Sequence, residues 1–256
     1  MTETASIRST SDGETAVRRQ PGLVWVALLA ASVVAFRVGA YLAPSRFVAV
    51  PEQLALPLGG LGLLFLGCGL FAWWARPSGA TRLFLFYGAG MGVHWGTPIG
   101  FASPELETVV LVLYAAATLG SDGALLDLAL RFPGREGRAA RVVSAVYLLA
   151  LGLAIAAIVT PFLPRQPLAV ALGIAFGASF LASIAAGIVF ATKWFRAARR
   201  ERRALGLTPV VAALAVASSL YLLGDAGVLP GPAQAWGLPF ALVPLALARA
   251  LTRARS

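Results

Sequence analysis

Long runs of apolar residues, separated by short polar segments, dominate the pattern along the chain. A helix needs about 20 such residues to cross a bilayer core about 30 Å thick, because it rises about 1.5 Å per residue and satisfies its own backbone hydrogen bonds. About eight runs meet this requirement, at residues 22–43, 55–75, 80–100, 105–131, 140–160, 167–192, 208–226 and 235–251. The pattern predicts an all-α fold, a polytopic transmembrane helix bundle of about eight spans, in which Pro244 kinks the last helix.

Composition supports this fold class and defines the domains. Hydrophobic residues make up 59% of the chain and charged residues only 12%, and the mean hydropathy is +0.80. These values differ from the roughly 45–50% apolar and 25% charged residues of a soluble domain. Residues 1–20 are rich in Ser, Thr, Glu and Arg, which predicts a disordered cytoplasmic tail. We expect one transmembrane helical domain over residues 21–256.

The net charge of +10 is distributed in a way that indicates membrane topology rather than nucleic-acid binding. Of the 21 Lys and Arg residues, only Arg37, Arg46 and Arg165 fall outside the segments that alternate spans would leave on one side of the membrane. Cytoplasmic segments of membrane proteins are enriched in Lys and Arg. The distribution therefore predicts that both termini are cytoplasmic, and it fits a multi-pass protein of the bacterial inner (cytoplasmic) membrane.

Glycines spaced four residues apart predict close helix packing on two of the runs. They are Gly88, Gly92, Gly96 and Gly100 on the third run, and Gly173 and Gly177 on the sixth. Such small-residue stripes let two helix backbones approach closely. Packing within the chain and a homodimer seam both fit the pattern.

Asp122 is the first candidate for a functional polar group. It follows Ser121 and lies about 13 Å deeper than the basic cytoplasmic boundary of its run, which places it near the midplane. An ionisable group at that depth is costly, and it indicates a ligand contact or a proton-linked switch. The alternative is a carboxyl that joins helices through hydroxyl groups such as those of Ser218, Ser219 or Tyr221.

A second acidic residue has a simpler interpretation. Asp127 lies four residues before Arg131, near the predicted cytoplasmic side. Residues at this spacing lie on one helix face, so the pair predicts an intrahelical ion pair.

His94 is the only histidine, which excludes bis-histidine haem ligation and histidine metal clusters. Beside Trp95, it is expected to be an interfacial hydrogen-bonding residue, and a pH sensor is the alternative. Cys68 is also alone, so no disulfide forms within the chain. The sequence lacks a phosphate-binding glycine-rich loop and an H-E-x-x-H motif. We expect no enzyme activity, no catalytic residues, no cofactor and no metal.

A basic segment follows the sixth run and is read as an extension of that helix. Its members proposed for cytoplasmic docking are Lys193, Arg196, Arg199, Arg200 and Arg203. The segment could attract anionic lipid or a protein partner, or it could simply anchor the helix on the cytoplasmic side.

Three motifs together resemble a known family. They are GLFAWWARP at 69–77 followed by ATRLF at 80–84, LLDLALRFP at 125–133, and RRERR at 199–203. Their order and spacing resemble the multi-pass membrane sensor module of bacterial histidine kinases of the competence and quorum-sensing type, over about residues 55–251. The sequence ends at Ser256, directly after the last predicted span, so we expect no kinase domain. The resemblance implies a stand-alone sensory or scaffold module that works with a separately encoded protein partner. A homo-oligomer is the alternative that the glycine stripes indicate.

The first functional hypothesis is a non-enzymatic integral membrane sensor or signalling accessory module. It would bind an apolar or amphiphilic ligand, or a membrane partner, with Asp122, Ser121 and His94 as the ligand-contacting or polar-network residues. A structural accessory subunit of a larger membrane complex is the alternative. A small transporter comes third, because the spans hold few polar groups that would define a solute path.

Overall fold

The computed structural model describes residues 52–96, 104–132, 141–159 and 165–253, and all regular secondary structure in these ranges is helical. The elements are α2 (Glu52–Ala75), α3 (Gly79–Gly96), α4 (Pro104–Arg131), α5 (Arg141–Val159), α6 (Arg165–Arg196), α7 (Arg199–Leu205), α8 (Leu207–Asp225), the 3-10 helix η3 (Ala233–Ala241) and α9 (Leu242–Arg253). The predicted all-α class is confirmed for this part of the chain. The predicted tail 1–20 and the run 22–43 lie outside the described residues.

Within the described residues, 5 helical segments are long and apolar enough to cross a membrane. They are Leu56–Ala75, Leu111–Arg131, Val170–Arg196, Leu207–Asp225 and Gln234–Arg253. Two of the predicted spans that the structure describes are not among these 5 segments. Helix α5 contains only a shorter apolar helix, Arg141–Ala156, and α3, with 18 residues, is not one of the 5. The described bundle is therefore a membrane-type helical fold with 5 clear spanning candidates.

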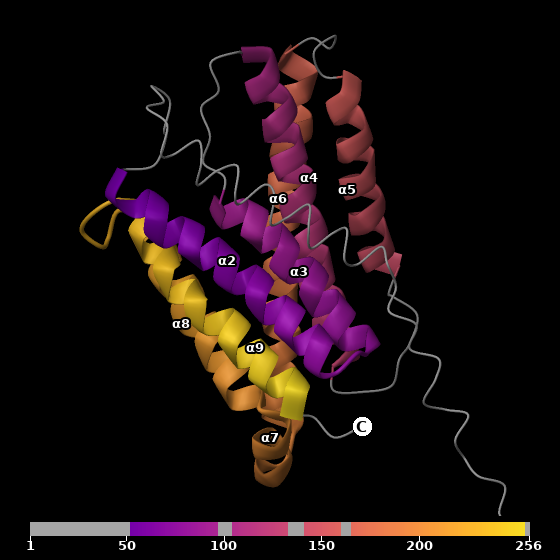
Figure 1. Ribbon diagram of the computed structural model, residues 1–256, viewed down its shortest axis with the longest axis vertical. Helices are drawn as coiled ribbons and strands as arrows, with labels where there is room; N and C mark the ends of the chain where they lie inside the picture. The colour runs from indigo at the N-terminus through magenta and orange to yellow at the C-terminus, as the bar shows by residue number, and fades with distance from the viewer. Residues whose placement is uncertain (1–51, 97–103, 133–140, 160–164, 254–256) are drawn as a thin grey trace, which may run out of the picture.

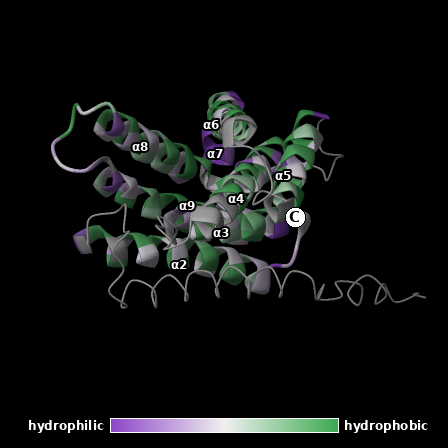
Figure 2. Ribbon diagram, turned by 90° about the horizontal axis from the view of Figure 1, so that it is seen from above, coloured by the Kyte–Doolittle hydropathy of each residue, from purple (hydrophilic) through white to green (hydrophobic). Residues whose placement is uncertain are grey.

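Large apolar side chains are exposed on the outer surface of the bundle. Leu148 on α5 is 68% exposed, Leu181 on α6 is 66% exposed, and Leu222 on α8 is 48% exposed. Figure 2 shows hydrophobic segments along α5, α6 and α8. A large exposed apolar surface indicates contact with lipid or with another protein.

The helices form two groups that meet along α3 and α4. In Figure 1, α4, α5 and α6 run steeply, whereas α2, α3, α8 and α9 run obliquely across the view. Helix α3 packs against both α2 and α4, and α4 packs against α5 and α6. Helix α6 contacts α8 far less extensively than it contacts α4. The two groups are thus tightly joined along one side and more loosely joined along the other.

The turn between α2 and α3 is built from local hydrogen bonds. Pro77 follows the end of α2, and a proline disfavours helical backbone in the residue before it. Ser78 Oγ accepts a hydrogen bond from the backbone N–H of Thr81, and Thr81 Oγ1 accepts one from the backbone N–H of Ser78. The Thr81 hydroxyl also donates to the carbonyl of Arg76 at 2.8 Å. These bonds satisfy backbone groups that a helix start leaves unpaired, which fixes the angle between α2 and α3.

The last predicted run changes helix type shortly before Pro244. It consists of the 3-10 helix η3 up to Ala241 and the α-helix α9 from Leu242. Pro244 lies in the first turn of α9, where the missing N–H costs least, and its ring would clash with a helical carbonyl four residues earlier, at Phe240. The irregularity therefore precedes the proline, on the side of the carbonyl with which its ring would clash.

Candidate functional site

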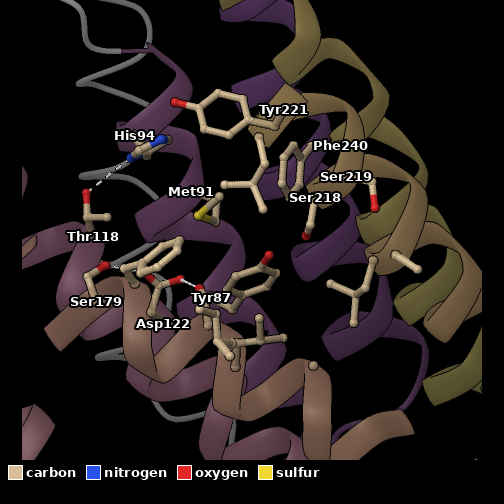
Figure 3. A pocket seen from close by; sticks show the side chains of 18 of the residues that line it. Tyr87, Met91, His94, Thr118, Asp122, Ser179, Ser218, Ser219, Tyr221 and Phe240 are labelled. Carbon is tan, nitrogen blue, oxygen red and sulfur yellow. Dashed lines mark hydrogen bonds between the residues drawn. The ribbon is translucent and has the colours of Figure 1, made fainter. Parts of the chain in front are cut away.

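A cavity of about 570 Å³ lies between α6 and α8, and α3, α4 and η3 complete its wall (Figure 3). Each long helix contributes one face: Thr118, Asp122 and Leu125 of α4 have the spacing of consecutive helical turns. Pockets of about 300–1,000 Å³ that are mostly apolar, with a few converging polar groups, are typical of small-molecule sites. The size and lining of this cavity fit that description.

The cavity opens sideways, between α6 and α8. Seven of its lining residues are also exposed on the surface of the bundle: Phe176, Phe180, Ile184 and Ile188 on α6, and Ala215, Ser219 and Leu222 on α8. Six of the seven are apolar, and Ser219 is the exception. The opening is therefore suited to the passage of an apolar molecule rather than a hydrated one.

Asp122 lies in the cavity wall and is 6% exposed. Its carboxylate accepts a hydrogen bond from the hydroxyl of Ser179 at Oδ2 and one from the hydroxyl of Ser183 at Oδ1, the latter at 2.6 Å. Because the two serines are four residues apart, both lie on one face of α6 and reach the two carboxylate oxygens together. Asp122 thus joins α4 to α6.

The predicted alternative of a carboxyl that joins helices through hydroxyl groups is confirmed for Asp122, but the partners named on the seventh run are wrong. Ser218, Ser219 and Tyr221 of α8 line the cavity but form no hydrogen bond with Asp122, whose partners come from α6. Figure 3 shows Ser218 and Ser219 on α8, separated from Asp122 by the space of the cavity. The hydroxyls of α8 are therefore available to a molecule inside the cavity.

Ser121 does not take part in this site. Its hydroxyl donates to the backbone carbonyl of Tyr87 on α3 at 2.8 Å, and its side chain is buried. The residue opposite is Gly90, where an added Cβ would lie 2.5 Å from the Cβ of Ser121. Ser121 therefore belongs to the packed contact between α3 and α4 and is not among the residues that line the cavity.

His94 lines the cavity and is held by α4. Its Nδ1 lies 2.9 Å from the hydroxyl of Tyr114 and 3.3 Å from Oγ1 of Thr118. The imidazole also stacks on the Tyr114 ring, with 5.3 Å between centroids. In Figure 3 its second ring nitrogen points away from Thr118, towards the side where Tyr221 lies. One nitrogen thus orients the ring, and no hydrogen bond of the other is present among the described residues.

Trp95, expected at the membrane interface with His94, is buried instead. It is 7% exposed and packs against the rings of Tyr221 and Phe240. Gly237 makes this possible, because an added Cβ there would lie 2.4 Å from the Trp95 ring. The indole Nε1 is buried and has no hydrogen-bond partner among the described residues. The cavity wall therefore contains a donor that the described residues leave unsatisfied.

The predicted glycine stripes behave differently on the two helices. On α3, an added Cβ at Gly88 would lie 2.5 Å from the carbonyl oxygen of Phe65, and one at Gly92 would lie 3.2 Å from that of Gly62, so both glycines face α2. Gly96 is the last residue of α3, and Gly100 lies outside the described residues. On α6, Gly173 and Gly177 have no atom within 4 Å of an added Cβ. They form no close packing contact with the described helices, contrary to the intramolecular alternative.

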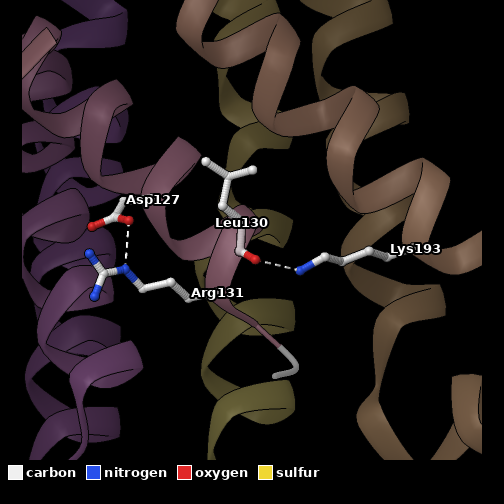
Figure 4. A network of polar contacts seen from close by, with 4 residues as sticks. All are labelled: Asp127, Leu130, Arg131 and Lys193. Carbon is white, nitrogen blue, oxygen red and sulfur yellow. Dashed lines mark hydrogen bonds and ion pairs between the residues drawn. The ribbon is translucent and has the colours of Figure 1, made fainter. Parts of the chain in front are cut away.

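Lys193, predicted as a docking residue, binds the end of α4 (Figure 4). Its ammonium donates to the carbonyl of Leu130 at 2.9 Å and to that of Phe132 at 2.8 Å. Terminal helix carbonyls lack partners and carry partial negative charge, so a lysine is well suited to this position. The predicted ion pair between Asp127 and Arg131 is confirmed beside it, with an N–O distance of 2.6 Å.

The basic segment is not a continuous extension of α6. The helix ends at Arg196, and α7 begins at Arg199. Arg202 bends back over the Trp194 ring, 4.5 Å from its centroid, and donates to the carbonyls of Ala197 and Phe195. The remaining predicted docking residues are Arg196, Arg199 and Arg200, which are exposed, and Arg203, which lies in α7.

Several site residues were not singled out from the sequence. Ser179 and Ser183 carry a readable signal, because hydroxyls spaced four residues apart mark one helix face. Tyr114 and Thr118 of α4 have the same spacing, and Thr118 donates back to the carbonyl of Tyr114 at 2.9 Å. Polar i,i+4 pairs within apolar runs would thus have located most of the polar wall.

Comparison with known proteins yields no relative. No family model, no curated protein and no solved structure matches the chain. The resemblance to histidine-kinase sensor modules stays a prediction, and the functional argument rests on the geometry of the cavity.

Proposed function

We propose that this protein is a non-enzymatic integral membrane sensor module that binds an amphiphilic molecule in the cavity between α6 and α8. The observation that carries the proposal is the combination of a sideways, apolar opening with a polar group at depth, the Asp122 carboxylate held by Ser179 and Ser183. An apolar chain would occupy the space between α6 and α8. A polar head would reach the polar wall.

The cavity is suited to signalling because it lies where the two helix groups are loosely joined. Helices α6 and α8 form its sides and share few other contacts. A ligand that binds one spacing of these helices more tightly than another shifts the equilibrium towards that spacing. Helix α7 connects α6 to α8, so such a change would reach the basic residues of α7.

The proposed setting is a bacterial inner membrane, with about eight spans and both termini in the cytoplasm. Arg76 follows α2, and Arg131, Arg196 and Arg253 end α4, α6 and α9. Helix α7 and the C-terminal ends of α2 and α9 lie together in the lower part of Figure 1. Basic residues gathered at one end of a bundle favour a cytoplasmic position for that end. A C-terminal green fluorescent protein fusion should fluoresce, and an alkaline phosphatase fusion that is active instead would contradict this orientation.

Photolabelling tests the ligand-binding proposal. The protein in lipid nanodiscs is irradiated with a diazirine-bearing dodecanol, and adducts are mapped by mass spectrometry. Adducts at Phe180 and Leu222, at the cavity mouth, should exceed several-fold those at Leu148 on the exposed side of α5, because a bound chain stays near the mouth longer than free lipid. Equal labelling of all exposed apolar residues would contradict the proposal.

A matched pair of variants separates the cavity from the surrounding surface. Ala215 lines the cavity on α8, whereas Ala212 is exposed on the same helix and does not line it. Ala215→Trp should abolish the excess labelling by filling the space, and Ala212→Trp should preserve it. The same loss in both variants would show that the labelling reports helix surface rather than the cavity.

A structural accessory subunit remains a second candidate, favoured by the open face of α6 around Gly173 and Gly177. Small residues exposed on a spanning helix permit close approach by another helix. Affinity purification from native membranes with mass spectrometry distinguishes the two. A co-purifying kinase supports the sensor, and a stable set of complex subunits supports the accessory role.

A further inference from the structure

The charges of the side chains that line the cavity indicate the chemical class of the proposed ligand. Among the residues that line the cavity, Asp122 is the only Asp or Glu, and none is Lys or Arg. Its carboxylate forms no ion pair within the described part of the chain. The wall thus presents one carboxyl group and, apart from the imidazole of His94, no basic side chain.

The hydrogen bonds of Asp122 satisfy only part of the carboxylate. Ser179 donates to one oxygen and Ser183 to the other, and a carboxylate has about four acceptor positions. Both serines are donors in this arrangement, which suits the ionised form of the acid. A buried ion is costly unless a charge of opposite sign compensates it. The remaining acceptor positions are therefore where a positively charged donor would be most stabilised.

The rest of the wall suits a cation attached to an apolar chain. Phe176 and Phe180 flank Ser179 along α6, and aromatic faces attract ammonium groups. Beyond them, Ile184, Ile188 and Leu214 provide an apolar surface. A molecule with two positive charges would find no second carboxylate, and an inorganic cation would leave the apolar part of the cavity empty.

We infer that the ligand is a monocationic amphiphile, such as a long-chain amine, whose ammonium group binds Asp122 and whose chain lies between α6 and α8. This inference rests on the proposed function, because it assigns a class to the ligand of the same cavity. The ammonium donates to the free acceptor positions of the carboxylate, and the serine hydroxyls keep that carboxylate in place. The chain enters from the bilayer through the apolar opening.

The test compares three diazirine probes that share one chain: dodecylamine, dodecanol and dodecanoate. Each probe is crosslinked by irradiation to the protein in lipid nanodiscs at neutral pH. The yield at the cavity mouth is divided by the yield at Leu148 and Leu151 of α5, which corrects for partition into the bilayer. We expect dodecylamine to exceed dodecanol by about tenfold, and dodecanoate to give the lowest ratio.

Two variants test the role of Asp122. Asp122→Asn keeps the size of the side chain and should bring dodecylamine and dodecanol to equal ratios. Asp127→Asn is the matched control, because Asp127 is a buried carboxylate on the same helix that pairs with Arg131 and does not line the cavity. This variant should retain the preference for the amine. Gel filtration and thermal unfolding show that each variant is folded.

The outcomes separate the inference from the proposed function. Equal cavity labelling of the wild-type protein by dodecanol and dodecylamine would overturn the inference, but it would not contradict an amphiphile site in the cavity. Preferential labelling by dodecanoate would also overturn the inference without contradicting that site. Persistence of the amine preference in Asp122→Asn would also overturn it. Absence of cavity labelling by all three probes would contradict the proposed function itself. The wild-type comparison decides the matter even if a variant fails to fold.

Discussion

The contact of α3 with its neighbours and the face of α6 contain the same kind of residue in opposite surroundings. Gly88 on α3 is pressed against the backbone of Phe65, and Gly90 against Ser121, so neither position has room for a side chain. Gly177 on α6 has open space where a side chain would be. A spacing of small residues therefore permits close packing, but the neighbouring helices decide whether it occurs.

This difference assigns two roles to the two regions. The contact of α3 with α2 and α4 fixes the relative positions of the helices that carry Tyr87, His94 and Asp122. Helices α6 and α8 contact each other far less extensively than they contact α4 and η3, respectively, and they enclose the cavity. Stability should depend mainly on the first region, and ligand binding on the second.

The largest loss of stability should come from Gly88→Val. The new Cβ would lie 2.5 Å from the carbonyl oxygen of Phe65, and a backbone atom within a helix cannot move aside easily. Overpacking of this kind costs about 3 kcal/mol. The free energy of unfolding in mixed detergent micelles, followed by circular dichroism, measures the change. A loss below about 1 kcal/mol would mean that α2 and α3 are not in close contact.

The polar contact between α4 and α6 should contribute less. Replacing both Ser179 and Ser183 by Ala leaves the buried Asp122 carboxylate without its donors, and we expect a loss of about 2 kcal/mol. The matched control replaces Ser218 and Ser219 by Ala, because these hydroxyls line the cavity without bonding to Asp122. Equal losses in the two double variants would show that the contact with Asp122 contributes nothing specific.

The lysine at the end of α4 should have a smaller effect. Lys193→Met removes the donor to the carbonyls of Leu130 and Phe132, and we expect it to cost about 1 kcal/mol. Arg200→Met removes a charge from exposed α7 and should change the free energy of unfolding by less than about 0.5 kcal/mol. If Arg200→Met proves the more damaging variant, the basic segment stabilises the protein by total charge rather than by this cap.

The smallest effect should come from Gly177→Val, the counterpart of Gly88→Val on the open face. With no atom within 4 Å of the new Cβ, the free energy of unfolding should change by less than about 0.5 kcal/mol. Thermal unfolding of the two valine variants side by side measures the contrast. A large loss at Gly177 in the purified protein would mean that another helix covers this face.

Much of the fold was predictable from the apolar runs, because the bilayer sets a helix length that shows directly in the sequence. The run predicted at 105–131 is α4, Pro104–Arg131, and the run at 208–226 is α8, Leu207–Asp225. An irregularity at Pro244 was predicted, but the 3-10 helix over Ala233–Ala241 was not, because the pattern does not show how far upstream a proline acts. Hydropathy locates a helix without orienting it around its axis.

The candidate site was predictable only in part. Asp122 was identified by its depth along the run, and His94 because it is the only histidine in the sequence. Their partners depend on which faces meet, so Ser179 and Ser183 were overlooked and Ser218 and Ser219 were assigned instead. Trp95 was misplaced for a related reason: tryptophan is enriched at membrane interfaces, but here Gly237 on a distant segment makes room for its ring inside the bundle.

An experimental density map of the protein, extracted from its native membrane with lipid, tests the central claim most directly. A rigid antibody fragment bound to the protein would make it large enough for electron cryo-microscopy. We predict a continuous, elongated density between α6 and α8 that ends at the Asp122 carboxylate, with Ser179 and Ser183 bonded to it. Direct packing of α6 against α8 that leaves no space for a ligand would contradict the account.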